Sequence, residues 1–102
     1  MRSVLNDIQA ERERQVNEEG WTSHHDDVHQ NGELASAAAC YANPKPRMRR
    51  HHTPTGLTKI PEQWPWHRSW WKPKDRRRDL IRAAALIVAE IERLDRLETT
   101  ND

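Results

Sequence analysis

The chain contains few of the residues that build a large apolar core or a covalent framework. Its 102 residues include no phenylalanine, one cysteine and three glycines, and only 34% are hydrophobic. A single cysteine excludes an intramolecular disulfide, and three scattered glycines exclude a phosphate-binding loop of the P-loop or Rossmann type. The alanines around Cys40 (ASAAACYA) indicate a small buried side chain rather than a nucleophile.

Long apolar runs are also absent. The longest, AAALIVA at 83–89, is far too short to span a bilayer. The first residues, MRSVLNDIQAERERQ, are amphipathic and charged, unlike a secretory leader. We therefore expect a cytoplasmic protein with no membrane partner.

The charge of the chain is nearly balanced, but it is unevenly distributed. The formal net charge is +1, whereas residues 43–78 hold eleven Lys or Arg against Glu62 and Asp75. Binding of nucleic acid through RMRRHH and KPKDRRR is one interpretation of this segment, and it predicts a strong salt dependence. The interspersed acids and the near-neutral total argue against it, so we do not expect a nucleic-acid partner.

Three stretches carry helical signals. Ser3 can cap the first helix and Gly20 can end it, Asp26 or Asp27 can cap the second, and Asp75 can cap the third. The third stretch has an apolar repeat at i, i+4, i+7, i+11 and i+14, formed by Leu80, Ala84, Ile87, Ile91 and Leu94. The predicted helices cover about 4–19, 26–42 and 75–97.

No stretch shows the alternation of a half-buried strand. All six prolines fall in residues 43–74, where no hydrophobic period survives. We therefore predict an all-α fold, a single domain over 1–102, with residues 43–74 as an irregular, basic insertion rich in Pro and Trp. Three helices with one apolar stripe each build only a thin core, so a homo-oligomer, dimer or tetramer, is expected.

Acidic side chains and a histidine on the predicted helices form a candidate metal site. Asp26, His29 and Glu33 stand at i, i+3 and i+7 on one helix face, and Asp75 and Asp79 stand at i, i+4 on another helix. Carboxylates from facing helices favour a hard ion, Mg²⁺ or Mn²⁺. The alternative for the acids near helix starts is a favourable interaction with the helix dipole. Zinc at HHDDVH is disfavoured because carboxylates dominate this segment.

Four of the five tryptophans occur in WPWHRSWWKPKDRRRDL at 64–80. One interpretation is structural, with the indoles holding the long insertion against the helices or against a partner subunit. The other is a nucleotide site, in which a tryptophan stacks on the base while basic side chains hold the phosphates. The candidate substrate-binding residues are Trp66, Trp70, Lys72, Lys74 and Arg76.

Two segments, GELASAAACYA and WPW…WWKPKDRRRDLIRAAALIVAEIERLDR, resemble the phage-type MazG-like nucleoside triphosphate pyrophosphohydrolases. The resemblance covers about 1–42 and 64–97. It implies an all-α fold in which an E-x-x-E and an E-x-x-D motif on two antiparallel helices bind Mg²⁺. It also implies hydrolysis of a nucleoside triphosphate to a monophosphate and pyrophosphate, and a host-cytoplasm location if the chain is phage-encoded.

In this resemblance Glu33 matches the second glutamate of the first motif, and Asp79 matches the aspartate of the second. Gln30 and Arg76 stand where the family has its other two glutamates. The neighbouring groups able to replace them are His29, Asp26 and Asp75. The implied metal ligands are His29, Glu33, Asp75 and Asp79.

In the same scheme Glu33 or Asp26 would orient the attacking water. The expected function is thus a metal-dependent (d)NTP pyrophosphohydrolase, purine-directed by analogy with the phage relatives. The alternative is a non-catalytic module on the same scaffold that binds a nucleotide, a signalling molecule or a host protein.

Overall fold

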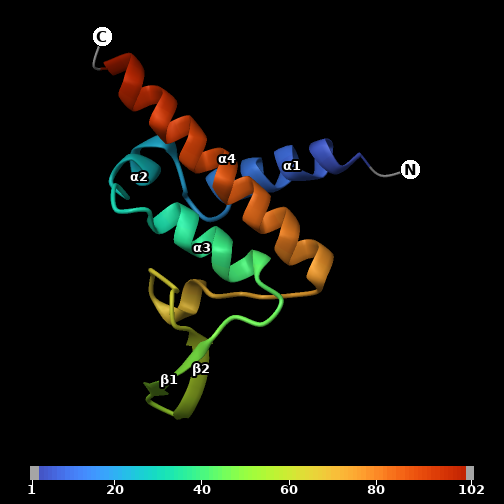
Figure 1. Ribbon diagram of the computed structural model, residues 1–102, viewed down its shortest axis with the longest axis vertical. Helices are drawn as coiled ribbons and strands as arrows, with labels where there is room; N and C mark the ends of the chain where they lie inside the picture. The colour runs from blue at the N-terminus through green and yellow to red at the C-terminus, as the bar shows by residue number, and fades with distance from the viewer. Residues whose placement is uncertain (1–2, 101–102) are drawn as a thin grey trace.

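The computed structural model describes residues 3–100. A long C-terminal helix crosses two shorter helices, and a small hairpin projects away from them (Figure 1). In chain order the elements are α1 (Val4–Asn17), α2 (Ser23–Asp27), α3 (Glu33–Ala42), β1 (Met48–Thr53), β2 (Gly56–Pro61), the short 3₁₀ helix η1 (Arg68–Trp70) and α4 (Arg76–Thr100). No helix in this part of the chain is both long and apolar enough to traverse a bilayer.

The hairpin overturns the all-α prediction, and the fold is mixed α and β. Strands β1 and β2 pair antiparallel, from Met48 opposite Pro61 to Thr53 opposite Gly56, inside the insertion that was predicted to be irregular. The prediction failed because MRRHHT and GLTKIP are almost wholly exposed, so burial imposes no alternation on their sequence. Only the end of β2 reaches the core, where Ile60 is buried.

The core lies between α3 and α4 and is closed by aromatic side chains. Helix α3 contributes Leu34, Ala37, Ala38 and Tyr41, and α4 contributes Ala83, Leu86 and Ala89. Trp21, Cys40, Ile60 and Trp64 complete the cluster. The many alanines allow the two helix backbones to approach closely, which leaves little room for larger side chains between them.

The apolar repeat predicted on the third helix lies mostly outside this core. Leu80, Ile87, Ile91 and Leu94 are 43–51% exposed, while Leu86 is fully buried. The helix itself is confirmed, but its more apolar face is not the face that packs on α3. A stripe of larger aliphatic side chains therefore runs along the outside of α4 in the single copy.

The predicted second helix is interrupted. Helix α2 starts after Thr22, whose hydroxyl accepts from the His25 backbone N–H at 3.3 Å, and it ends at Asp27. Helix α3 begins after Gly32, which adopts φ +80° in the left-handed region. The chain therefore turns at 28–32 instead of continuing as one helix, because only a residue without a Cβ adopts this conformation readily.

Gly32→Ala is expected to lower the free energy of unfolding by about 1–2 kcal/mol, the cost of a left-handed Cβ-bearing residue. The space around a Cβ at this position is open, so the cost is conformational and not steric. Urea unfolding measures it. Gly32→Asn should be milder, because asparagine tolerates this backbone conformation, and an alanine variant as stable as the wild type would contradict the argument.

Candidate functional site

The end of α3 and the start of α4 meet and are held together by Arg76. Its guanidinium donates to the carbonyl oxygens of Tyr41, at 3.3 Å, and of Ala42. These are among the last carbonyls of α3, which lack partners within the helix, and a cation there also complements the helix dipole. The two helices are therefore antiparallel neighbours at this point.

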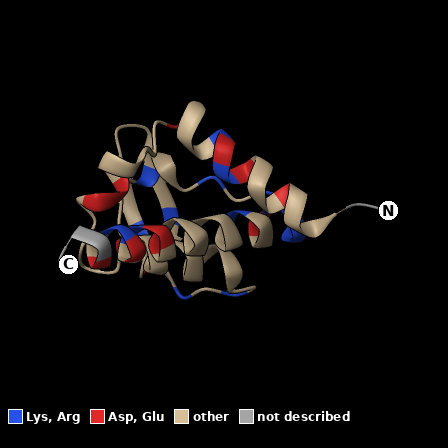
Figure 2. Cartoon of the chain, turned by 90° about the horizontal axis from the view of Figure 1, so that it is seen from above, with Lys and Arg blue, Asp and Glu red and all other residues tan. Residues whose placement is uncertain are grey.

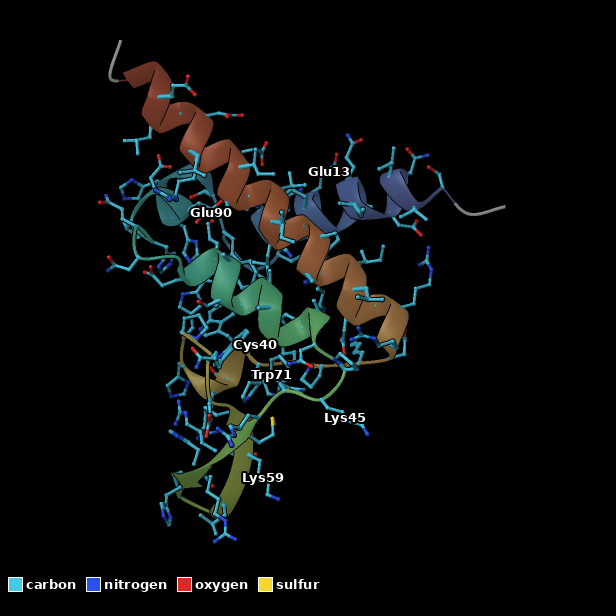
Figure 3. The ribbon with its side chains drawn as sticks, in the orientation of Figure 1. Glu13, Cys40, Lys45, Lys59, Trp71 and Glu90 are labelled. Atoms are coloured by element: carbon cyan, nitrogen blue, oxygen red, sulfur yellow. The ribbon has the colours of Figure 1, made fainter. Side chains whose placement is uncertain are left out.

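A groove of about 520 Å³ opens beside this junction, and we call it the α3–α4 groove. Lys45, on the loop after α3, and Trp71, on the segment before α4, line it together with Cys40 (Figure 3). The residues of the groove with aromatic or ionisable side chains are Cys40, Tyr41, Lys45, Trp71, Lys74, Arg76 and Asp79. Two aromatic rings thus lie beside three cations and one carboxylate.

Tyr41 and Trp71 form the aromatic wall of this groove. Their ring centroids lie 4.7 Å apart with 33° between the planes. The Tyr41 hydroxyl donates to the Trp70 carbonyl at 3.3 Å and accepts from the Lys72 backbone N–H at 3.1 Å. Burial raises the pKa of Tyr41, so the ring remains neutral and serves as a rigid wall.

The only cysteine also lies at this groove. Cys40 is 4% exposed, and burial raises the pKa of its thiol. A thiol with a raised pKa is a poor nucleophile. The prediction of a small buried side chain is confirmed.

The two carboxylates predicted on α4 have different surroundings. Asp75 caps the helix as predicted, since its Oδ1 accepts from the Arg78 backbone N–H at 2.9 Å. Asp79 lies in the α3–α4 groove, where its Oδ1 accepts from the Lys74 backbone N–H at 2.8 Å. Asp75 instead borders a second hollow, on the α1 side of the helix.

Asp26, His29 and Glu33, the other predicted ligands, belong to one hydrogen-bonded chain. Arg12 Nη2 contacts Asp26 Oδ2 at 2.6 Å, and Asp26 Oδ1 lies 3.1 Å from His25 Nδ1. His25 Nε2 lies 3.3 Å from His29 Nε2, and His29 Nδ1 lies 3.1 Å from Glu33 Oε2. Asp26, His29 and Glu33 therefore lie in one cluster with His25, but across the turn between α2 and α3 and not on one helix face as predicted.

This cluster and Asp79 lie at opposite ends of α3. Glu33 begins the helix and Tyr41, in its last turn, lies beside Asp79, a separation of about 12 Å along the axis. At the Glu33 end the neighbouring part of α4 is its later half, where Arg96 contacts Asp27 at 2.7 Å. The four predicted Mg²⁺ ligands therefore do not surround one point within this copy.

Across residues 3–100 no group of three or more His, Cys, Asp or Glu side chains is arranged to hold a metal ion. The residues present thus do not fit the magnesium site that the resemblance implies. Antiparallel packing accounts for this, because it sets the start of α3 against the later half of α4 and not against its first turn.

The predicted substrate-binding residues also separate into two groups. Lys74 and Arg76 line the α3–α4 groove. Trp66 packs against Trp21 and His29, with centroids 5.3 and 5.4 Å away. Trp70 also packs against Trp21, at 5.9 Å, and the Lys72 ammonium lies 5.3 Å from the Trp70 ring centroid.

Sequence reasoning missed Lys45 as a groove residue, and it did not single out Trp71 or Tyr41 for binding. Lys45 stands between two prolines in NPKP, which extends the chain after α3 and places it beside the groove. A basic residue held between prolines directly after a helix was the available signal. Because Lys45 and Lys74 are far apart in the sequence, the sequence did not show that both lie at this groove.

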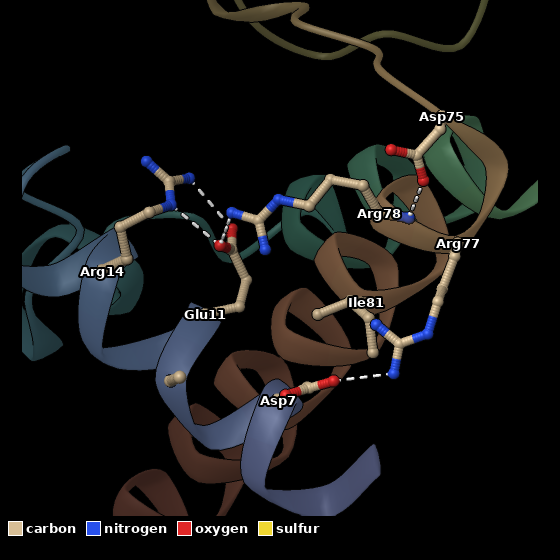
Figure 4. Close-up of a pocket in the computed structure, with 8 residues that line it drawn as sticks. Asp7, Glu11, Arg14, Asp75, Arg77, Arg78 and Ile81 are labelled. Carbon is tan, nitrogen blue, oxygen red and sulfur yellow. Dashed lines mark hydrogen bonds and ion pairs between the residues drawn. The ribbon is translucent and has the colours of Figure 1, made fainter. Parts of the chain in front are cut away.

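The second hollow, of about 430 Å³, is an ion-pair cluster between α1 and α4 (Figure 4). Glu11 has no exposed side-chain surface and accepts from Arg14 at 2.8 and 2.9 Å, from Gln15 at 3.1 Å and from Arg78. Arg77 contacts Asp7 at 2.6 Å. Figure 2 shows how closely acidic and basic residues intersperse on α1. Because the charges here are already paired, this hollow is a structural joint between helices.

Glu11 was also missed by sequence analysis. Burial raises its pKa, but the hydrogen bond and charge of Arg14, with the charge of Arg78, outweigh burial, so the pKa lies below its ordinary value. The sequence signal was the position of Glu11 and Gln15 on the side of the helix that carries Val4 and Ile8.

Comparisons of the chain with family models, with curated proteins and with solved structures give no match. The resemblance to the MazG-like enzymes therefore stays a prediction from residues, and the argument for function depends on the geometry above.

Proposed function

We propose that the protein binds a nucleotide in the α3–α4 groove. The observation that carries the proposal is the aromatic pair Tyr41 and Trp71 beside the cations Lys45, Lys74 and Arg76, in a hollow of about 520 Å³. A nucleotide presents one flat aromatic base and several phosphate charges. Indole stacking and charge-assisted hydrogen bonds are the usual protein contacts for those two parts.

In this proposal the base lies against Trp71 and the phosphates lie toward the three cations. The volume falls within the range of small-molecule sites, which favours a single nucleotide over a longer nucleic acid. The three cations also face only one carboxylate, Asp79, among the groove residues. Because Arg76 also binds the last carbonyls of α3, the cations available to the phosphates are chiefly Lys45 and Lys74.

Binding without hydrolysis, the alternative predicted from sequence, is the form that this geometry supports best. Metal-dependent hydrolysis needs several carboxylates beside the triphosphate, and the groove offers one. The second candidate is the (d)NTP pyrophosphohydrolase that the resemblance implies, with Mg²⁺ or Mn²⁺. It is favoured by the location of Asp79, the residue that matches the family's aspartate, beside the three cations.

A panel of nucleoside triphosphates and deoxynucleoside triphosphates tests both candidates. Calorimetry and thermal shift measure binding with Mg²⁺, with Mn²⁺ and with EDTA, and pyrophosphate release measures turnover in the same samples. We expect at least one nucleotide to bind. Metal-dependent formation of monophosphate and pyrophosphate would favour the enzyme, and the absence of any binding at millimolar nucleotide would contradict both.

Lys74→Glu is expected to weaken nucleotide binding at least tenfold, because it reverses one of the three charges facing the phosphates. The Lys74 backbone N–H still donates to Asp79, so the helix start is preserved. Lys59→Glu is the matched control, since Lys59 lies on the hairpin away from the groove (Figure 3). Equal losses in both variants would indicate a general charge effect and contradict the assignment of the groove.

We also propose that the chain forms a homo-oligomer through α4. The support is the exposed stripe of Leu80, Ile87, Ile91 and Leu94, whose spacing is that of a helix-pairing seam. An identical stripe on a second copy is complementary to it in length and period. A two-fold arrangement would cover both stripes at once.

A further inference from the structure

Two imidazoles face each other at the start of α3. His25 Nε2 and His29 Nε2 lie 3.3 Å apart. The other ring nitrogen of each histidine contacts a carboxylate at 3.1 Å, Asp26 for His25 and Glu33 for His29. Each ring is thus fixed at one end by an acid and presents its second nitrogen to its neighbour.

The hydrogen positions follow from these partners. An ionised carboxylate only accepts hydrogen bonds, so each Nδ1 must carry a hydrogen. In the neutral rings both Nε2 atoms are then unprotonated, and they lie 3.3 Å apart with 67° between the ring planes. Two lone pairs at 3.3 Å repel each other unless a positive species, either a shared proton or a metal ion, lies between them.

The separation suits a metal ion. Bonds of about 2.0–2.1 Å from imidazole nitrogen to zinc, at a tetrahedral angle, place the two nitrogens about 3.3–3.4 Å apart. In metal sites a histidine that binds the ion through Nε2 usually donates its Nδ1–H to a carboxylate, which fixes the orientation of the ring. We propose that His25 and His29 chelate Zn²⁺, because the carboxylates of this segment contact the two Nδ1 atoms and leave both Nε2 atoms for the ion.

The surroundings hold the two rings in place and leave them open to solvent. Trp21 stacks on His25 with 8° between the planes, and Trp66 contacts the His29 ring at 5.4 Å. Asp26 is fully buried and is itself held by Arg12. The histidine side chains remain 31% and 18% exposed, so an ion can enter from water.

Within the described part of the chain no third His, Cys, Asp or Glu completes the set. Water or an external ligand would therefore occupy the remaining positions, and the site would bind more weakly than a four-ligand structural zinc centre. Imidazole nitrogen favours transition metals over Mg²⁺, so this site differs in chemistry from the magnesium site that the resemblance implies. It also stands at the far end of α3 from the nucleotide groove and does not depend on the proposed function.

Titration of EDTA-treated, full-length protein with Zn²⁺, followed by calorimetry, tests the proposal. We expect one ion to bind per chain and Mg²⁺ to give no signal. His25→Ala and His29→Ala should each weaken Zn²⁺ binding at least tenfold. His24→Ala is the matched control, because His24 is exposed on the same short helix and should leave binding unchanged.

A measurement on the wild type keeps the test valid if the alanine variants unfold. Zn²⁺ should protect His25 and His29 from acylation by diethyl pyrocarbonate, mapped by mass spectrometry, while His24 reacts equally with and without the ion. No binding at millimolar Zn²⁺ near neutral pH would overturn the proposal and indicate a shared proton only. The proposal would also be overturned if His24→Ala weakened Zn²⁺ binding as much as the other two variants, or if Zn²⁺ protected His24 from acylation equally.

Discussion

Glu11→Ala is expected to lower the free energy of unfolding by about 3 kcal/mol, the cost of breaking a buried ion pair by removing one partner. The substitution removes a fully buried carboxylate and leaves Arg14 and Arg78 facing each other without their shared partner. We use the lower end of the range for broken buried ion pairs, because these arginines are 26% and 31% exposed and regain some hydration. Urea unfolding at neutral pH measures the loss.

The matched control is Glu13→Ala on the same helix. Glu13 is exposed, and its interaction with Gln9 Nε2 spans 3.4 Å at the surface, so we expect a change within about 0.5 kcal/mol. Similar losses in both variants would show that α1 responds to helix propensity or net charge. That result would contradict the assignment of Glu11 as the joint between α1 and α4.

The same carboxylate should also affect acid stability. Because the pKa of Glu11 in the folded chain lies below its ordinary value of 4.5, its contribution is fully present above that value and is lost as pH falls through the folded pKa. The stability difference between wild type and Glu11→Gln is therefore expected to be constant near neutrality and to shrink as the pH falls below 4.5. A difference that does not change down to pH 3 would contradict the low pKa.

Ile91→Asp is expected to convert a homo-oligomer into a monomer, with the fold retained. Ile91 is 51% exposed at the middle of the α4 stripe, so a charge there costs little in the single chain but is buried when two stripes meet. Its neighbours Leu80, Ile87, Val88, Leu94 and Leu97 are each 36–50% exposed, so a second copy of the stripe would cover apolar surface along most of the helix. Light scattering at micromolar concentration measures the change.

Leu57→Asp is the matched control for this prediction. Leu57 is 59% exposed on the hairpin, away from α4, and should leave the oligomer intact. Circular dichroism checks that both variants keep the wild-type helix content. A wild-type chain that is monomeric at these concentrations would contradict the proposal directly, and an oligomer that survives Ile91→Asp would locate the interface elsewhere.

The boundaries of the helices were largely predictable because they depend on groups close in sequence. The Ser3 side chain accepts from the Asn6 backbone N–H, three residues on. Asp75 does the same for Arg78 and begins α4 where the sequence predicted. The break of the second predicted helix was not predictable in this way, because only the folded backbone shows the left-handed conformation of Gly32.

The two functional clusters were predictable only in part. Asp26, His29 and Glu33 do lie in one cluster, but the turn at 28–32 brings them together and not the continuous helix face that their spacing predicted. The role of His25 and the closeness of Lys45 to Lys74 were not visible. Both depend on how separate segments fold back on one another.

The sequence by itself determined where α1 and α4 begin and which short stretches carry the acids, histidines, tryptophans and cations. Only the tertiary structure decided that β1 and β2 pair, that α4 buries Leu86 and exposes Ile91, and that Glu33 and Asp79 lie at opposite ends of α3. The physical reason is the range of the interactions. Caps and turns are determined within a few residues, whereas helix facing, strand pairing and the meeting of distant carboxylates depend on which surfaces of the whole chain pack together.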